Sequence, residues 1–430
     1  MTQLLSQLAT LTTGRLTGAA LVFFVTLILA RLYGSDVLAG YSVALSAASI
    51  LSVLLPLGFH AVATLFAAEY RAVHKSTALR AFTRYAHVLT FRNAAIAFVV
   101  LSAISFLVPA HPPYDLQLLA FFCVLIGYFM ATIYINSALL IGMERHYWAH
   151  LPDMVLRPAL LLLALVLLSL ADLKSATGVL TALLGAVVIT ALVQSLAMKK
   201  ALPVKGTEIS APETLGVERK AWWKIAPDHM KITLLWDYFF EFHILLAGVL
   251  LMPEQVATLF ICFRIRQLAG FGLRSVYSLR MPRVMAANAR GDKKEAQGIL
   301  SSLVRISGAY AILVWIGMGF VGPYVLQAFG PEYGEAQSIL LTLMATIVVR
   351  GLFGPSSVVL GMERHAAVIV KILFASLVLS LLLTWIGSIY FGVWSVAGAY
   401  FVSTTFSAIA IWWIAQNRTA LNTAIWSKSQ

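Results

Sequence analysis

The chain has 430 residues, of which 60% are hydrophobic and 11% are charged, and its formal net charge is +13. A soluble globular domain carries roughly 25% charged residues, so this composition suits lipid better than water and excludes an ordinary soluble protein. The two cysteines, Cys123 and Cys262, lie inside apolar runs, which argues against a disulfide framework and a cysteine metal site.

Apolar runs of about 20 residues, the length needed to cross about 30 Å of hydrocarbon, recur along the chain. No signal-peptide cleavage site follows the first run, so we expect it to remain as a helix. The runs predict an all-α polytopic membrane protein with twelve transmembrane helices, at 8–31, 37–59, 93–109, 115–141, 152–171, 176–197, 230–252, 255–279, 303–326, 335–360, 366–387 and 392–415.

Positive charge is distributed unevenly between the loops that join these runs. The termini and even-numbered loops hold 25 of the 31 lysines and arginines, and the odd-numbered loops hold only Arg31 and Lys174. Cytoplasmic loops are enriched in these residues, so both termini are predicted to be cytoplasmic. The positive charge is therefore interpreted as a topology signal and not as a nucleic-acid interface. The odd-numbered loops are also too short to hold a catalytic domain.

A repeated pentapeptide divides the chain into two halves. Gly142-Met143-Glu144-Arg145-His146 recurs as Gly361-Met362-Glu363-Arg364-His365, at an offset of 219 residues, and the same offset relates Arg71 to Arg290. Six helices per half is an even number, so the halves share one orientation, as in transporters with parallel repeats. The pentapeptide itself is interpreted as a structural turn that follows a helix.

The longest polar stretch lies between the two halves. We expect residues 199–223 to form a cytoplasmic linker between an N-terminal six-helix lobe, 1–198, and a C-terminal six-helix lobe, 224–430. The stretch contains prolines, glycines and mixed charge, which favour a loop.

Short motifs spread over nearly the whole chain carry a family resemblance. They are Gly14-Arg15-Leu16-Thr17-Gly18, Leu29-Ala30-Arg31-Leu32-Tyr33-Gly34, Trp236-Asp237-Tyr238, Met281-Pro282-Arg283-Val284-Met285, Arg290-Gly291-Asp292 and Phe329-Gly330-Pro331-Glu332-Tyr333. Together they resemble the oligosaccharide flippases of the MOP superfamily, the Wzx type, which are relatives of the MATE exporters.

The resemblance implies a function as well as a fold. It implies a non-enzymatic flippase of the bacterial inner membrane that moves undecaprenyl-diphosphate-linked sugars to the outer leaflet by alternating access between the lobes. The expected partners are this polyprenyl-linked glycan, membrane lipids and other polysaccharide assembly proteins. No cofactor is expected, and coupling to H+ or Na+ stays open.

Charges inside the membrane cost at least about 2.5 kcal/mol each, so they are the candidate functional residues. Arg15 is predicted inside the first span, either facing a central cavity as a phosphate ligand or reaching the headgroups. Gly14 and Gly18 beside it form a small-xxx-small pair that permits close helix packing. Arg31, at the outer end of the same helix, suits a capping or headgroup role better than a substrate site.

Two carboxylates are predicted on one face of the seventh span. Asp237 and Glu241 are four residues apart, and Arg264 in the next span lies at a depth that matches Glu241. A Glu241–Arg264 ion pair is therefore expected, either as a protonation-sensitive switch or as a permanent neutralising pair.

Buried charge is predicted to differ between the halves. Arg264, Arg266 and Arg350 have no charged counterpart 219 residues earlier, so we expect the C-terminal half to carry most of the phosphate recognition. Arginine suits that role because its fork binds phosphate in a bidentate manner. His243 and Lys371 are weaker candidates, favoured as a core histidine and as a lysine that extends to the headgroups. No metal site is expected.

Other function classes remain as alternatives. A MATE-like proton- or sodium-coupled exporter of small cations is the main one, and arginines in the cavity argue against cationic substrates. A lipid II flippase of the fourteen-helix type would need two more spans. Membrane glycosyltransferases, polymerases and ligases carry large extracytoplasmic loops, which this chain lacks. The absence of a GxxxxGK[ST] motif argues against ATP hydrolysis as the energy source.

Overall fold

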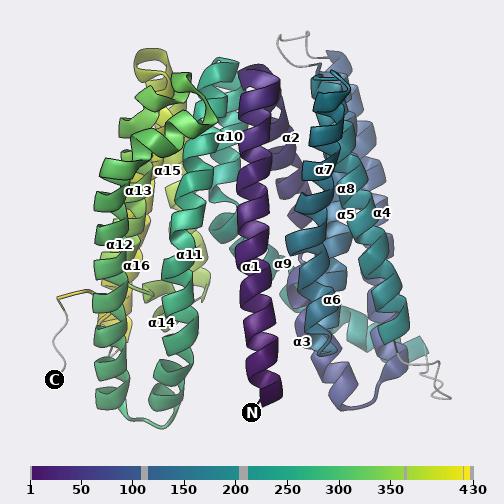
Figure 1. The fold of residues 1–430 in the computed structure, drawn as a ribbon. Coiled ribbons are helices and arrows are strands. Elements are labelled where there is room, and N and C mark those ends of the chain that lie inside the picture. The colour runs from purple at the N-terminus through teal and green to yellow at the C-terminus, as the bar shows by residue number, and fades with distance from the viewer. Residues whose placement is uncertain (1, 108–114, 203–211, 363–365, 420, 427–430) are drawn as a thin grey trace. The chain divides into compact units, whose positions relative to one another are not determined.

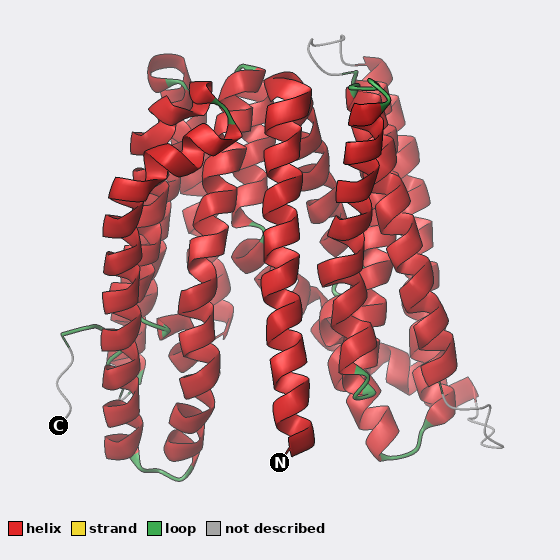
Figure 2. Ribbon diagram, viewed as in Figure 1, coloured by secondary structure: helices red, strands yellow, loops and turns green. Residues whose placement is uncertain are grey.

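The computed structural model describes residues 2–107, 115–202, 212–362, 366–419 and 421–426. Throughout these ranges the regular structure is helical, with no strand (Figures 1 and 2). The all-α fold class predicted from the sequence is confirmed. The chain forms two compact units, Met1–Glu241 and Phe242–Gln430. The lobe boundaries predicted at 198 and 224 stay a prediction.

The first unit contains eleven elements and the second unit is built from the rest. The first runs through α1 Thr2–Ile28, the π-helical turn η1 Leu29–Tyr33, α2 Gly34–Leu54, α3 Phe59–Ala72, α4 Ser76–Leu107, α5 Leu116–Gly142, α6 His146–Leu151, the π-helical turn η2 Pro152–Leu156, α7 Arg157–Leu170, α8 Ala176–Ala201 and α9 Pro212–Asp237. The helix α10 Phe239–Leu250 crosses the boundary between the units at Glu241. The second unit then runs through α11 Pro253–Ala289, α12 Lys293–Phe329, the 3-10 turn η3 Pro331–Ala336, α13 Gln337–Phe353, α14 Ser356–Met362, α15 Ala366–Phe391 and α16 Val393–Arg418.

The described helices are long and apolar enough to account for the twelve predicted spans. Ten stretches qualify by length and composition, and the bent pair of α9 and α10 adds another. One of the ten, Thr13–Leu54, has 42 residues. A straight helix of that length would extend about 63 Å, twice the hydrocarbon thickness. It is broken by η1 and by Gly34 at a φ of 85°, so we count it as two spans.

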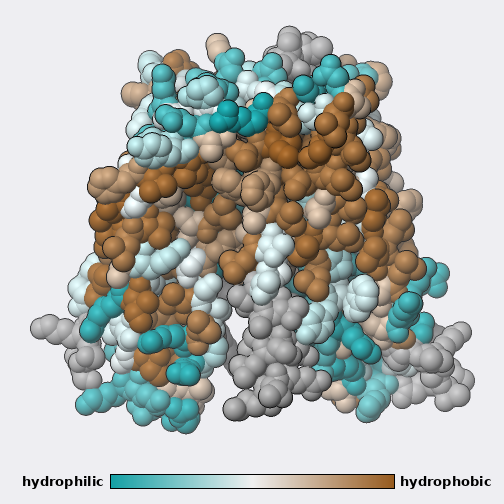
Figure 3. All heavy atoms as spheres, in the orientation of Figure 1, coloured by the Kyte–Doolittle hydropathy of each residue, from teal (hydrophilic) through white to brown (hydrophobic). Residues whose placement is uncertain are grey.

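The polar and apolar surfaces agree with a membrane location. Hydrophobic residues cover the middle of the helices on the visible face, and hydrophilic residues gather toward their ends (Figure 3). Many large apolar side chains are exposed in the middle of the helices, among them Phe91 of α4 at 62% and Leu313 of α12 at 69%. In water such a surface would be an aggregation hazard, whereas lipid tails solvate it.

Helix α5 is the centre of the first unit. It packs against α2, α3, α4 and α8. Gly142 at its end lets the backbone approach α3, because an added Cβ would lie 2.6 Å from the carbonyl oxygen of Thr64. The glycine of the first pentapeptide therefore serves helix packing as well as a turn. The residues Glu363, Arg364 and His365 of the second pentapeptide lie outside the described residues.

The predicted linker contains a docked helix. Residues 203–211 lie outside the described residues, but from Pro212 the chain is helical as α9. Trp222 of α9 is 2% exposed and belongs to the apolar core that contains Phe59 and Phe82. Its indole Nε1 donates to the Tyr70 hydroxyl at 2.7 Å. Residues 212–223 of the predicted linker are therefore helical, with an aromatic face that α3 and α4 bury, and the linker itself stays a prediction.

The second unit is built around α11, α12, α13 and α16, with α15 packed along α16. The span predicted at 335–360 is interrupted at Gly354, whose φ is 62°, and α14 follows. The segment 421–426 packs at this interruption, where Ile425 N donates to Leu352 O at 2.9 Å and Ser356 Oγ is 2.5 Å from Thr423 Oγ1.

Candidate functional site

Arg266 occupies the interior of the second unit. It projects from α11, and its Nε donates to Thr346 Oγ1 on α13 at 2.7 Å. Its guanidinium carbon lies 4.9 Å from the ring centroid of Tyr400 on α16. Both partners are uncharged, so the local contacts orient the guanidinium without neutralising it.

Two further arginines act on Arg266 electrostatically. They are Arg350 on α13 and Arg274, two turns further along α11. The carbonyl oxygen of Arg350 accepts a hydrogen bond of 3.2 Å from the Tyr277 hydroxyl, which ties α13 to α11. Arg274 is exposed, Arg266 and Arg350 are half-buried, and we call these three electrostatically interacting residues the arginine cluster. Arg274 was not among the sequence candidates.

Arg264 turns away from this cluster. Its Nη1 donates to Gln267 Oε1 on the same helix at 2.9 Å, and its guanidinium carbon lies 4.7 Å from the Phe260 ring centroid. Residues two apart on a helix point in very different directions, which explains why only one of the pair joins the cluster. The expected Glu241–Arg264 ion pair stays a prediction, because the two residues belong to different units.

Tyr400 connects the arginine cluster to a buried histidine. His243 is fully buried, and its ring packs edge-on against Tyr400 with centroids 5.1 Å apart. Its Nε2 lies 2.5 Å from Ser380 Oγ on α15. Sequence reasoning missed Tyr400, Thr346 and Ser380, because a neutral polar residue in an apolar run gives no sign of its neighbours.

The two acidic candidates have different environments. The helix predicted at 230–252 bends by 65° between α9 and α10. Asp237 ends α9 and is exposed, whereas Glu241 lies in the first turn of α10 and is 8% exposed. Their predicted placement on one helix face is wrong, because the helix is interrupted at Tyr238. A helix N-terminus favours a negative side chain, which is consistent with Glu241 in that first turn.

The first unit holds a polar cluster that the sequence did not reveal. Arg157 Nε and Asp153 Oδ1 are 2.9 Å apart, at the junction of η2 and α7. Tyr134 of α5 is hydrogen-bonded to Tyr238, and both tyrosines interact electrostatically with Arg157. Single π-helical turns are frequent at functional sites. Asp153 and Arg157 lie near a predicted span end, where charges usually serve topology, so nothing singled them out.

Arg15 lies on the exposed side of α1, near His150 of α6. Gly14 and Gly18 beside it pack closely against α6 and η2, as the small-xxx-small pair predicted. A Cβ on Gly18 would lie 2.2 Å from Met154 O, and one on Gly14 would lie 2.8 Å from the Leu151 side chain. This close packing places Arg15 at the α1–α6 side of the unit.

The remaining candidates lie on the surface. Arg31 in η1 and Lys371 on α15 are both exposed. Across the described residues, no group of three or more His, Cys, Asp and Glu side chains could hold a metal ion.

No protein-family model and no curated protein matches the chain. Solved structures do match. An inward-facing multidrug resistance MATE family transporter of the MOP superfamily is similar with a TM-score of 0.76 over 93% of this chain and 94% of that chain, at 15% identity. The chain has the MATE fold.

Two further structures with this fold are similar. An outward-facing multidrug resistance MATE transporter has a TM-score of 0.60 at 16% identity, over 95% of this chain and 94% of that chain. A MOP superfamily transporter from Pyrococcus furiosus, described by a reverse polarity of its binding pocket that suggests a different function, has a TM-score of 0.63 at 14% identity, with the same coverage. These likenesses show the fold of the chain.

Proposed function

We propose that this protein flips a polyprenyl-diphosphate-linked oligosaccharide across the bacterial inner membrane, by alternating access between its two lobes. The observation that carries the proposal is the arginine cluster. Arg266 has a hydroxyl and an aromatic ring as its partners, and the cationic side chains of Arg274 and Arg350 act on it. Such a cluster complements a diphosphate, whose oxygens accept paired hydrogen bonds from guanidinium groups.

The cluster also has a physical cost that a substrate would offset. Like charges that lie close to one another repel, and the repulsion falls when an anion binds between them. A diphosphate brings two or more negative charges on one small group. Arg264 and Arg15 are proposed as additional phosphate contacts outside the cluster.

A proton-coupled switch is proposed at Glu241. Glu241 is 8% exposed in the first turn of α10, and intramembrane carboxylates are typical of proton pathways in transporters. Asp237 is a second coupling candidate, whereas His243 and Lys371 are proposed in structural roles and Arg31 in a headgroup role. The proposed partners beyond the glycan are membrane lipids and the proteins that assemble the polysaccharide.

The second candidate function is a MATE-like exporter of small molecules, because two of the similar structures are multidrug resistance transporters. Three arginines near one another disfavour cationic substrates. The Pyrococcus furiosus protein, with its reversed pocket polarity, supports the view that this fold accommodates substrates of different charge.

The test replaces Arg266, Arg274 and Arg350 singly with glutamine and measures surface polysaccharide export in a strain that lacks the native gene, at matched expression. We expect export to fall by about ten-fold or more for Arg266→Gln, because a charge-assisted hydrogen bond contributes roughly 1.5–3 kcal/mol. Arg266→Lys should recover only part of the activity, since lysine lacks the planar fork.

Arg305→Gln is the matched control, because Arg305 is an exposed arginine of α12. It should export normally. Normal export by all three cluster variants would contradict the flippase proposal. Drug efflux by the wild-type protein, with no effect of its deletion on surface polysaccharide, would favour the exporter.

A further inference from the structure

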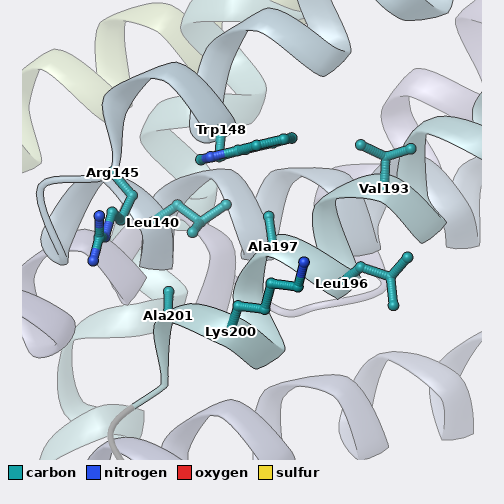
Figure 4. A pocket seen from close by; sticks show the side chains of 8 residues that line it. All are labelled: Leu140, Arg145, Trp148, Val193, Leu196, Ala197, Lys200 and Ala201. Atoms are coloured by element: carbon teal, nitrogen blue, oxygen red, sulfur yellow. The ribbon is translucent and has the colours of Figure 1, made fainter.

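A cavity of about 360 Å³ opens at one end of the first unit, which does not contain the arginine cluster. It lies where the end of α5, the start of α6 and the end of α8 come together, and its lining comprises Leu140, Arg145, Trp148, Val193, Leu196, Ala197, Lys200 and Ala201 (Figure 4). All eight residues belong to the first unit, so the cavity is complete within it.

The lining combines two cations with an apolar wall. Figure 4 shows the Lys200 ammonium directed into the space beneath the Trp148 ring, with Arg145 at one end of the cavity. Leu196 and Val193 form the opposite end. Trp148 and Leu196 are 54% and 57% exposed, so they present an accessible apolar surface. An occupant must therefore carry both negative charge and a hydrocarbon part.

The two cations are available to a ligand. Among the ion pairs of the described residues, neither Arg145 nor Lys200 takes part in one. The neighbouring carboxylate of Glu144 is engaged by Arg71 instead, and this hydrogen bond holds the pKa of Glu144 below its usual range. Glu144 therefore stays ionised, and its negative charge neutralises Arg71 and not the two cavity cations.

Packing holds the walls of the cavity in place. Gln194 is fully buried, and its Nε2 donates to Ala149 O and Ser137 Oγ at 2.9 Å each and to Trp148 O at 3.3 Å. These bonds join α8, α5 and the backbone that bears Trp148. The position of the indole is therefore set by a buried polar network and not by a mobile loop.

The position of the cavity along the helices matches a membrane interface. Spans Leu116–Gly142 and Ala176–Ala201 end there, and span His146–Leu170 begins there. Tryptophan is enriched at the level of lipid headgroups, and basic pockets between transmembrane helices bind anionic headgroups. A second cavity of about 520 Å³ shares Arg145 and Ala201 and has a mixed lining that includes Leu79 and Met143 beside Arg71, His74 and the Arg71-paired Glu144, which leaves room for a headgroup.

We propose that this cavity binds one anionic phospholipid of the leaflet that faces the lysine- and arginine-rich loops. Lys200 and Arg145 hold the phosphate, and one acyl chain lies along Trp148 and Leu196. The arginine of the first repeated pentapeptide, Arg145, thereby has a ligand-binding role in addition to the structural turn. The site is separate from the proposed transport pathway and does not depend on the identity of the transported substrate.

The test measures lipid binding to the purified full-length protein by native mass spectrometry. The probe is dioleoylphosphatidylglycerol, compared with dioleoylphosphatidylcholine of the same chains and with soluble glycerol phosphate. The variants are Lys200→Gln, Arg145→Gln and their combination, and the matched control is Lys199→Gln, an exposed lysine of the same helical turn that does not line the cavity. The Lys200→Arg variant keeps the positive charge and tests whether that charge is sufficient for lipid binding.

We expect phosphatidylglycerol to bind more tightly than phosphatidylcholine, and each neutralised cavity charge to weaken it about five-fold. Lys199→Gln and Lys200→Arg should bind as the wild type does. Equal binding of the two lipids, or an equal loss in Lys199→Gln, would overturn the proposal. Competition by glycerol phosphate as strong as by the whole lipid would identify a soluble phosphate site and overturn it as well.

Discussion

At the scale of single residues, close backbone contacts in the first unit depend on glycine. Gly58 has a φ of 89°, and an added Cβ would lie 1.9 Å from the carbonyl oxygen of Ala226 on α9. L-amino acids with a side chain rarely adopt this backbone conformation, and backbone atoms cannot move aside as a flexible side chain can. Gly58 therefore both interrupts the helix between α2 and α3 and admits α9.

Gly58→Ala should destabilise the first unit by roughly 2 kcal/mol or more, since both the left-handed φ and the steric clash oppose the new methyl group. The measurement is thermal unfolding of the purified protein in detergent. Gly185→Ala is the control, because a Cβ at this helical position meets nothing within 4 Å. A melting temperature that falls equally in both variants would show that the α9 contact is unimportant.

At the scale of elements, interrupted spans are covered by segments from elsewhere in the chain. The α2–α3 interruption is covered by α9, and the α13–α14 interruption is covered by residues 421–426. In the second unit, Gln297 forms two hydrogen bonds with the backbone of Asn422. Its Nε2 donates to the Asn422 carbonyl oxygen at 2.9 Å, and its Oε1 accepts from the Asn422 amide at 2.8 Å. From the same segment, Ile425 N donates to Leu352 O, a carbonyl group that the interrupted helix leaves open.

Gln297→Ala should release the segment 421–426 from α12. Two hydrogen bonds of about 1 kcal/mol each are lost, so the Asn422 and Ile425 amides should exchange with solvent deuterium about ten-fold or more faster. Lys294→Ala, an exposed change one turn away on α12, should leave the exchange unaltered. Unchanged exchange in Gln297→Ala would mean that the remaining contacts alone hold the segment.

At the scale of the whole molecule, the charge distribution predicts on which side of the membrane each loop lies. Lysines and arginines gather in the even-numbered loops, as the positive-inside rule expects of cytoplasmic loops. The two native cysteines are buried and therefore poor targets for a water-soluble reagent. Single new cysteines can thus report the side on which each loop lies.

Lys174→Cys should react with a membrane-impermeant maleimide in intact cells, whereas Lys293→Cys should react only after permeabilisation. Both lysines are exposed residues at helix ends, so each is a fair reporter of its loop. Labelling is read by gel shift at matched expression. Reaction of Lys293→Cys in intact cells would invert the topology and place the termini outside.

The sequence by itself determined the features that depend on local composition. Helix count, helix type and the turn after Gly142 follow from runs of apolar residues and from charges and glycines at their ends. Crossing a bilayer requires such runs, because lipid cannot satisfy open backbone groups or solvate charge. The sequence also picked out Arg266 and Arg350, since an arginine in an apolar run is conspicuous.

The tertiary structure decided which side chains meet. The contacts of Arg266 with Thr346 and Tyr400 and the packing of Trp222 all join residues from different helices. Hydropathy along one helix does not specify its rotation or its neighbours, so these contacts could not be predicted. The bend at Tyr238 and the cavity beside Lys200 depend on the same packing, because each exists only where separate helices converge.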